Sequence, residues 1–499
     1  MFQSGLLQII PHFLSLLALY TIITCVVQYW HFRKVPGPPL AAWTNLWLMW
    51  HMNNGELLQE LKSRLHQTYG PTQRYGPNRI FFSQLEAVPI ILSTLNPFPK
   101  ASSYDPPKVF NHGSEVASLV SITDDRRAAR IKRNLHSQFS LNGVLIYEKH
   151  VDHTVNELVN HLRAAGRTVD LKQWCDWFAF DAMARIAFSE DQGFMKQQKD
   201  VGGSAAAAKA RFKHWSLYWA IPSLDAILYK NWFVRRSKRP LSGLTRIAID
   251  SIERRRGKEG SETQGDDLLG LYMGSAKLDP ELFTPSTTIG LTVSTISAGS
   301  ETTAYTTAVT MYCLLENPRV LATLRAELES ISATTESGWS LPPMAALRPL
   351  QYLEACVKEA NRLHPVVATM PEREVPAGGA TIAGLYVPAG TIVAVNTAGI
   401  YSNTEIFGND IDVYRPERWL EVNDEQRTKM NRANLLFSAG KRMCLGLNVS
   451  WLEMRKVIPA LVMNFDMSLA YPERGLKHVP GLFNEPGEII THISPRHMA

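Results

Sequence analysis

Residues 437–446 read FSAGKRMCLG and place one cysteine, Cys444, between two glycines in a basic loop. A thiolate is a soft, strongly donating metal ligand, and it stays ionised where positive potential and backbone N–H groups surround it. A loop that runs into the N-terminus of a helix supplies both. The alternative is a small buried hydrophobe, the usual state of a lone cysteine. The surrounding pattern favours the ligand.

The neighbours of this cysteine each suit such a site. Gly440 allows a tight turn before the ligand, and Gly446 lets the following helix lie against a flat cofactor with no Cβ between them. Arg442 can fork onto a carboxylate of that cofactor. Phe437 can pack under the loop and keep water from the sulfur. The loop therefore suits an iron held by one protein sulfur, with its opposite face open.

Composition and missing motifs remove several other classes of protein. The chain has 499 residues, of which 45% are hydrophobic and 20% charged, so it can bury a substantial core. A net charge of +6 is too small to indicate a nucleic-acid partner. Five widely spaced cysteines without a C-x-x-C pair indicate neither a disulfide framework nor a structural zinc site. Zinc-protease, hydrolase-elbow, dinucleotide and P-loop motifs are also absent from the sequence.

The N-terminal segment is apolar. Residues 6–30 contain no Asp, Glu, Lys or Arg and would span roughly 37 Å as a helix, enough to cross a bilayer. Arg33 and Lys34 follow the segment and no basic residue precedes it, which predicts a cytosolic C-terminal side. A cleaved signal peptide would have a basic start and a small-residue cleavage site. We therefore expect a single-pass anchor over residues 1–34 and a catalytic domain over residues 35–499.

Helical periodicity dominates that catalytic domain. Apolar residues recur at helical spacing over residues 266–274, 287–318 and 350–365, and the long middle segment ends at an Asn-Pro pair. Strand signals are short, at residues 79–83 and at 380–397, where two apolar runs flank a Pro-Ala-Gly turn. The pattern predicts a mainly α fold with a minor β component.

Five residues of the cysteine loop carry a resemblance to a known family: Phe437, Gly440, Arg442, Cys444 and Gly446. They match the haem-binding signature of the cytochrome P-450 monooxygenases. The resemblance implies haem b, with Cys444 as the axial ligand of its iron, and NADPH-derived electrons that arrive through the flavins of a separate reductase. It extends over the whole chain. Residues 36–47 and 373–379 look like those of fungal microsomal members from secondary metabolism, such as pisatin demethylase-like enzymes.

An acid and an alcohol interrupt the long apolar helix. Glu301 and Thr302 lie in the sequence AGSETT. We expect Gly299 to loosen the helix there and Thr302 to bond back to a carbonyl one turn earlier. The resemblance places this segment across the open face of the haem, where the two side chains would relay protons to bound oxygen.

Two further motifs point to structural and propionate-binding roles. Glu359 and Arg362 form an i,i+3 pair; in the family this pair is buried and is joined by a later arginine, here Arg418 of PERW. Such a triad stabilises the surroundings of the cysteine loop and needs every member. The resemblance also implies that Arg373 contacts a haem propionate.

The sequence departs from the family in one helix. The family's W-x-x-x-R pattern falls on Ala128 and Lys132, and a lysine reaches a propionate as a point charge without the fork. The same helix is rich in cations, which in the family meet the acidic flavin domain of the reductase. These are Arg126, Arg127, Arg130, Lys132 and Arg133.

The expected function is therefore that of a membrane-anchored monooxygenase of the endoplasmic reticulum, with its catalytic domain in the cytosol. The substrate-facing segments of the family map onto mostly apolar stretches, including residues 110–119, 366–370 and 482–483, which suits a hydrophobic small molecule. Hydroxylation, epoxidation or desaturation of a terpenoid, polyketide or alkaloid would fit. A haem-thiolate isomerase or dehydratase needs no proton relay, and a haem sensor would leave Glu301 and Thr302 unexplained.

Overall fold

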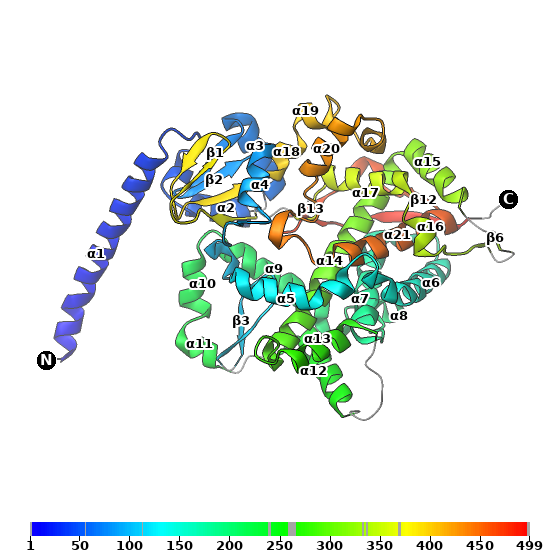
Figure 1. Ribbon diagram of the computed structural model, residues 1–499, viewed down its shortest axis with the longest axis horizontal. Coiled ribbons are helices and arrows are strands. Elements are labelled where there is room, and N and C mark those ends of the chain that lie inside the picture. Colours follow the sequence, from blue (N-terminus) through cyan, green and yellow to red (C-terminus); the bar gives the residue numbers. More distant parts are fainter. Residues whose placement is uncertain are drawn as a thin grey trace.

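A long helix projects from a mainly helical body (Figure 1). The projecting helix is α1 (Phe2–His31). The helical body with small sheets confirms the predicted fold class. The computed structural model describes residues 2–54, 56–111, 113–237, 241–257, 266–331, 334–335, 338–367 and 371–496.

The helices account for most of the described residues. Those of the first half are α2 (Leu46–Asn53), α3 (Leu58–Tyr69), α4 (Val88–Ile91), α5 (Asp125–Phe139), α6 (Glu148–Ala164), α7 (Leu171–Phe188), α8 (Phe194–Gln197), α9 (Ser204–Tyr218), α10 (Pro222–Tyr229), α11 (Trp232–Arg236) and α12 (Gly243–Arg256). Those of the second half are α13 (Leu268–Leu278), α14 (Pro285–Glu316), α15 (Pro318–Glu329), α16 (Met344–Leu347), α17 (Gln351–Leu363), α18 (Thr397–Tyr401), α19 (Thr404–Phe407), α20 (Asp424–Ala433) and α21 (Leu447–Asn464). The three helices expected from periodicity correspond to α13, α14 and α17.

The strands form one four-stranded sheet, one three-stranded sheet and four two-stranded pairs among the described residues. The largest sheet has the order β1 (Thr72–Gly76), β2 (Arg79–Phe82), β11 (Ile392–Val395), β8 (Arg373–Glu374), with β11 parallel to β2. The three-stranded sheet has the order β12 (Phe465–Leu469), β15 (Ile490–Pro495), β5 (Thr168–Asp170). The pairs are β3 (Val109–Asn111) with β4 (Ser114–Val116), β6 (Thr334–Thr335) with β7 (Gly338–Trp339), β9 (Ala380–Ile382) with β10 (Leu385–Val387), and β13 (His478–Val479) with β14 (Glu485–Pro486).

The expected pair of runs in residues 380–397 is divided differently in the structure. Three strands form there, and β10 pairs with β9 rather than with the run beyond the Pro-Ala-Gly turn. Ala383 and Gly384 both have positive φ, at 46° and 81°, and close a tight hairpin between β9 and β10. The run after the turn becomes β11 and joins β2, so one apolar segment serves two sheets.

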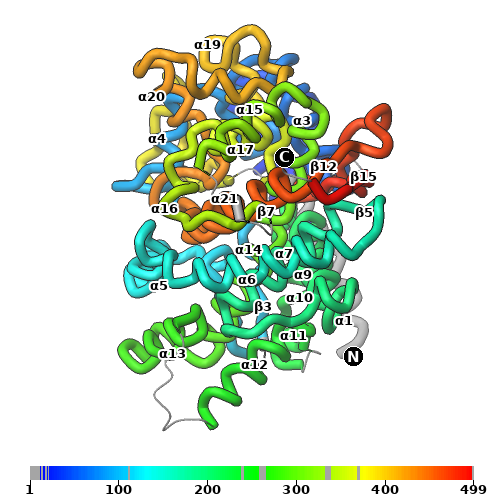
Figure 2. The backbone as a smooth tube through the Cα atoms, turned by 90° about the vertical axis from the view of Figure 1, so that its right-hand side faces the viewer, coloured from blue at the N-terminus to red at the C-terminus, as the bar shows by residue number. Residues whose placement is uncertain are grey.

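The long helix α14 runs through the middle of the helical body (Figures 1 and 2). The Thr284 side chain caps its first turn by accepting from Thr287 N, and Pro285 stands at N1. The helix is continuous through Gly299, which therefore does not loosen it as expected. A Cβ at Gly299 would lie 2.6 Å from Met183 Sδ of α7. The glycine instead permits close packing of α14 on α7.

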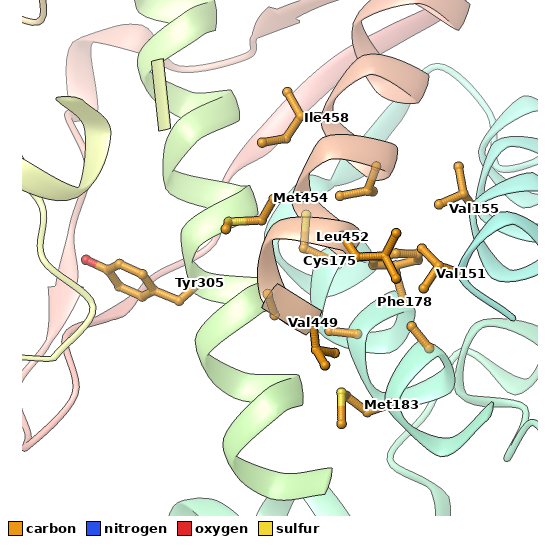
Figure 3. Close-up of a cluster of buried hydrophobic side chains, with 14 of the residues drawn as sticks. Val151, Val155, Cys175, Phe178, Met183, Tyr305, Val449, Leu452, Met454 and Ile458 are labelled. Atoms are coloured by element: carbon orange, nitrogen blue, oxygen red, sulfur yellow. The ribbon is translucent and has the colours of Figure 1, made fainter. Parts of the chain in front are cut away.

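The helix that follows the cysteine loop, α21, rests on a rigid apolar core. Figure 3 shows Leu452 of α21 beside Phe178 of α7 and Val151 of α6, while Met454 points toward α14. All four side chains are at most 1% exposed. Burial of such side chains contributes roughly 1.5–3 kcal/mol each, and close-packed interiors resist displacement. The start of α21, and with it the cysteine loop, is therefore held firmly.

The end of α1 is fixed to the body by side-chain contacts. Tyr29 stacks on Trp43 with ring centroids 4.6 Å apart, and Arg74 Nη2 donates to Gln28 O at 3.3 Å. Over the described ranges, no helix combines the length and apolarity needed to cross a bilayer. The spanning role of residues 1–34 therefore stays a prediction.

One lysine of the domain near α1 is buried without a carboxylate partner among the described residues. Lys62 of α3 is 0% exposed, and its Nζ donates to Thr397 Oγ1 at 2.7 Å. Burial lowers the pKa of Lys62 to about 7. Below pH 7 the buried side chain of Lys62 is charged, so the free energy of unfolding is reduced by the full cost of desolvating that charge. The penalty shrinks as the pH rises toward the unfolded pKa of 10.5, because the unfolded chain alone then keeps the proton.

We predict that Lys62→Met raises the free energy of unfolding, with the largest gain below pH 7 and a gain that fades toward pH 10. Urea unfolding of the wild type and the variant at pH 6 and pH 9.5 measures this difference. Lys358→Met is the control, since Lys358 pairs with Glu354. An equal gain at both pH values would contradict the prediction.

Candidate functional site

The cysteine loop is shaped by a close contact that only glycine allows. Cys444 lies between the short 3-10 helix η7 (Gly440–Arg442) and α21, and its N–H donates to Phe437 O at 3.0 Å. Gly440 has φ +69°, and a Cβ there would lie 1.6 Å from Leu92 O. Any other residue would push the loop away from α4 and displace the sulfur.

Two opposing influences act on the pKa of the Cys444 thiol. Although the Cys444 side chain keeps an exposed surface, the surrounding protein desolvates it and raises the pKa of its thiol. The backbone N–H groups of Gly446 and Leu447 and the charge of Lys132 lower that pKa. Lys132 Nζ donates to Met443 O at 2.6 Å and to a second loop carbonyl at 3.2 Å. These donors and this charge are the ones a thiolate needs.

Four cations gather beside this loop, and their positive charge bears on whether the site can hold the propionates of a haem. Their mutual repulsion, after desolvation, holds the pKa of Lys100 far below its usual range. The acid that opposes them is Asp125, which accepts from Arg442 Nε at 2.6 Å. The buried Arg373 donates to Glu372 O at 2.9 Å. The four cations are Lys100, Lys132, Arg373 and Arg442.

This excess of positive charge suits two carboxylates, which haem carries as propionates. The space beside Gly446 is also open, because a Cβ there would meet only Cys444 Sγ, at 3.9 Å. The residues present therefore fit a haem. Lys100 was missed by sequence reasoning, since it lies between Pro99 and Ala101 and belongs to no motif. Lys100 reaches the site only because the fold brings residues 119–120, 125 and 442 next to it. Its Nζ donates to Val120 O at 2.7 Å.

The acid–alcohol pair lies on α14. Thr302 Oγ1 donates to Ala298 O at 2.7 Å, which is the back-bond expected from the sequence. Glu301 Oε1 is buried and has no hydrogen-bond partner among the described residues. Burial, helped by the negative charges of Glu485 and Asp176, raises the pKa of Glu301 to about 8. Near neutral pH this carboxyl therefore holds a proton that it can give up, as a general acid must.

A buried ion network forms around Glu359. Its Oε1 accepts from Arg362 Nη2 at 2.9 Å and from Arg418 Nε at 2.7 Å, and Trp419 Nε1 donates to Oε2 at 2.9 Å. Glu359, Arg362 and Arg418 are all at most 4% exposed. Arg418 also reaches Asp410 Oδ1 at 2.8 Å. The structure thus brings together the three residues that the sequence assigned to one triad.

A second buried acid was not singled out from the sequence. Glu453 of α21 is 0% exposed, and neither of its buried carboxyl oxygens has a hydrogen-bond partner in the part of the chain that the structure describes. Thr303, next to Thr302, is the polar group that acts on it, and Thr303 Oγ1 donates to Ser450 Oγ at 3.3 Å. Burial raises the pKa of Glu453 to about 8. The acid therefore sits, protonated, between α14 and α21.

The cations of α5 divide into two groups. Arg127 pairs with Glu115 at 3.4 Å and Arg130 with Asp279 at 2.7 Å. Arg126 and Arg133 are exposed, and neither has an ion-pair partner in the part of the chain that the structure describes. A hollow beside the cysteine loop is lined by Asp125, Ala128, Ala129, Lys132, Arg133, His136, Lys441 and Arg442. This face is positively charged and lies on the sulfur side of the site.

The predicted substrate segments come together only in part. Phe483 pairs with Val367 in an isolated bridge, and its ring lies 4.4 Å from that of Phe212 of α9. Residues 368–370 lie outside the described residues. Phe110 of β3 instead lies under Arg235 of α11, with the guanidinium 4.3 Å from the ring centroid.

Comparison with known proteins matches the family model for cytochrome P-450 over residues 36–489. A pisatin demethylase of Fusarium vanettenii is 33% identical, over 98% of this chain and 94% of its own length. The cytochrome P-450 monooxygenase pkfB of Emericella nidulans is 32% identical, over 95% and 93%. The cytochrome P-450 monooxygenase mpaDE' of Penicillium brevicompactum is 33% identical over 91% of this chain. The chain spans about half of that relative, 54%.

The protonated Glu453 makes a pH-dependent prediction. Its folded pKa lies above the unfolded value of 4.5, so the stability of the wild type falls as the pH rises from 4.5 to 8, because the unfolded chain ionises first. Glu453→Gln keeps the shape and a donor toward Thr303 but cannot ionise. We expect the thermal midpoint of this variant to exceed that of the wild type by more at pH 8 than at pH 5.

The control is Glu425→Gln, which changes a carboxylate that is paired with Lys429 on the exposed helix α20. Thermal midpoints of the haem-loaded proteins at the two pH values provide the measurement. A Glu453→Gln advantage that does not grow with pH would show that the acid ionises freely in the fold.

Proposed function

The chain belongs to the cytochrome P-450 family, and from that premise we propose that it is a monooxygenase that oxidises a hydrophobic small molecule with O2 and NADPH-derived electrons. The observation that carries the proposal is the coincidence of two features at one loop. Cys444 stands at the start of a helix with N–H groups directed at its sulfur, and four cations gather beside it. A bound haem would supply the iron at which O2 is reduced and one oxygen atom is transferred to a C–H bond or a double bond.

Residues on the two sides of a bound haem would have different roles in ligation, propionate binding and proton supply. Cys444 would ligate the iron, while Phe437 keeps one side of the loop covered by packing against Trp451, with ring centroids 6.3 Å apart. Arg373, Arg442 and Lys132, with Lys100, would hold the propionates. Glu301 would supply protons from its buried carboxyl. Retention of this acid beside Thr302 disfavours an isomerase or dehydratase, whose chemistry needs no proton delivery.

Electron supply is assigned to the positively charged face of α5 and the cysteine loop. Arg126 and Arg133 have no ion-pair partner within the described ranges and can pair with an acidic partner, and Lys441 lines the adjoining hollow. Opposite charges accelerate such encounters. An NADPH–cytochrome P-450 reductase, which presents an acidic flavin domain, is the partner proposed.

Membrane attachment is proposed from the N-terminal side of the molecule. The segment of residues 6–30 is uncharged, and it lies within α1. Large apolar side chains are also exposed on the elements nearby, which favours burial in lipid. They are Leu40, Trp43, Leu46 and Trp50 around α2, and Ile227, Leu228, Trp232 and Phe233 of α10 and α11. We assign the endoplasmic reticulum membrane, with the catalytic domain in the cytosol.

We propose a role in fungal secondary metabolism, and the names of similar proteins support it. The names of the similar proteins include a demethylase of pisatin and several fungal monooxygenases. A terpenoid, polyketide or alkaloid precursor would suit the largely apolar segments around Phe483. Feeding such precursors to an expressing host, with analysis of the products, identifies the substrate and the oxidised carbon.

The ligand assignment predicts the spectrum of the reduced carbon monoxide complex. The wild type should give a Soret band at the position typical of thiolate ligation, and Cys444→Ala should lose it. Cys25→Ala, which changes a cysteine of α1, is the matched control and should keep the band. An unchanged band with normal haem content in Cys444→Ala would contradict the assignment of Cys444 as the iron ligand.

The relay predicts an uncoupling variant. Thr302→Ala should keep the haem spectrum but divert a large share of NADPH electrons to hydrogen peroxide, since proton delivery to oxygen is disturbed. Thr292→Ala is the control, because Thr292 Oγ1 makes the same back-bond, to Thr288 O at 2.9 Å, on the same helix. Product and peroxide formed per NADPH are measured. Full coupling in Thr302→Ala would remove this hydroxyl from the relay.

A further inference from the structure

Two histidines join the hairpin β13–β14 to the end of α17. Nε2 of His478, on β13, lies 3.3 Å from Nδ1 of His364, the residue that follows α17. The two rings are tilted, with their centroids 5.4 Å apart. Because the two nitrogens face each other at hydrogen-bond distance, one ring donates and the other accepts. The contact therefore requires that at least one of the two rings is neutral.

The histidine pair lies against α14, next to the acid–alcohol pair. Tyr305 follows Thr302 by one turn of α14, and its ring stacks on that of His478, with centroids 6.2 Å apart. The Tyr305 hydroxyl donates to His364 O at 3.2 Å, so one tyrosine contacts both histidines. In Figure 3 this side chain points from α14 away from α21. The contacts thus place the base of the hairpin beside the proposed relay.

The hairpin has little strand pairing of its own. Its strands have two residues each, and a short isolated hairpin is at best marginally stable. Inside it, Gly487 N–H donates to Lys477 O at 2.7 Å. Asn484 ties it to the segment after α17, since its N–H donates to Val366 O at 3.0 Å and its Nδ2 to Pro365 O at 2.7 Å. A change in the histidine contact therefore acts on a weakly held element.

The surroundings do not stabilise a proton added to the pair. His478 Nδ1 is buried and has no hydrogen-bond partner within the described ranges. Arg362 of α17 adds positive charge near His364, and Lys477 adjoins His478 in the chain. Tyr305 of α14 is uncharged, since burial holds its pKa well above the usual range. An imidazolium in this place would face cations and a neutral ring.

The carboxylate of the hairpin is already engaged. Glu485 of β14 pairs with Lys172 at 3.0 Å and contacts Lys209 Nζ. Among the described residues, no carboxylate is a cause of the pKa shift of either histidine. Burial lowers the pKa of both histidines, and that of His364 falls to about 4. The pair is therefore neutral at pH 7, and acid conditions oppose the contact.

We propose that His478 is a positioning residue that, through His364, holds the hairpin β13–β14 beside the acid–alcohol pair, and that protons entering the histidine pair release the hairpin and open the site to ligands. This inference rests on the proposed function, since it concerns access to the same site. When both rings are protonated, each facing nitrogen carries a hydrogen, so repulsion between two cations replaces the hydrogen bond. Release of the hairpin would bring both rings into water.

The direction of the pH effect follows from the proton count of the two states. The pKa of His364 is about 4 in the closed state and returns to 6.5 when the ring is hydrated. The open state therefore binds more protons, and its population rises as the pH falls from 6.5 toward 4. For His364 alone this amounts to roughly a tenfold increase between pH 7.5 and pH 5.5. His478, whose pKa is also lowered by burial, adds to the increase.

Hydrogen exchange of the full-length, haem-loaded protein measures the opening directly. The amides of Asn484 and Gly487 are protected by the hydrogen bonds to Val366 O and Lys477 O. We expect their protection factors, corrected for the intrinsic pH dependence of exchange, to fall at least about tenfold from pH 7.5 to pH 5.5. The hairpin β9–β10 contains no histidine, so its protection should stay constant.

Variants assign the response to the pair. His478→Gln keeps an amide that can hydrogen-bond to His364 but cannot be charged, so it should retain protection at pH 7.5 and lose part of the fall. The double variant His364→Gln/His478→Gln should lose the fall entirely. His492→Gln is the matched control, because His492 is exposed on β15 and bonds to Thr168, and it should show the full response.

Binding of an azole connects the hairpin with the site. The association rate of 1-benzylimidazole is read from the Soret shift and expressed per concentration of neutral azole. It should rise with acid by about the same factor as the opening in the wild type, and it should not change with pH in the double variant.

Three results would overturn the inference. The first is protection of Asn484 and Gly487 that does not change with pH in the wild type. The second is a fall that persists in the double variant, which would assign it to other groups. The third is a fall without any change in azole association, which would show that the hairpin does not control access. A lack of any Soret shift with the azole would instead refute the proposed haem site, and the positioning role with it.

Discussion

The buried carboxylate of Glu359 is the interaction on which the site depends. It joins α17 to the segment that leads to the cysteine loop, by accepting from Arg362, Arg418 and Trp419. That segment, residues 408–446, holds little regular structure beyond α20 and two short 3-10 helices. Without helices or sheets to hold it, its path is set by Arg418, whose other donors reach Asp410 and Val413. Removal of one member of such a network costs about 3–5 kcal/mol, because a buried charge is left uncompensated.

The balance of positive and negative charge differs between the two sides of the site. On the sulfur side, four cations face the charge of Asp125, a surplus that carboxylates of a cofactor can neutralise. Near Glu301, Lys172 and Lys209 are matched by Asp176 and Glu485. Glu301 is kept mostly neutral at pH 7 by the same burial that isolates it. The surplus of positive charge therefore lies on the sulfur side, where the cofactor would bring its carboxylates.

Much of this could be predicted from the sequence, because local spacing carries it. The cysteine loop has its glycines and basic residues within ten positions, and the periodicity of residues 287–318 and 350–365 gives α14 and α17. The features that escaped prediction depend on long-range contacts. Lys100 gains its role only when α5 and the cysteine loop meet it. Gly299, predicted to loosen α14, is explained only by Met183 of α7.

The two faces of the site are joined behind the cofactor position. Thr303, one residue after Thr302, donates to Ser450, six residues after Cys444. Glu453 lies one turn further along α21, in the same buried layer. A shift of α21 relative to α14 would therefore strain this polar contact inside an apolar core, where an unmatched group is costly. The sulfur and the acid–alcohol pair are consequently held in one rigid frame, and the distance between them is set by helix packing rather than by the loop.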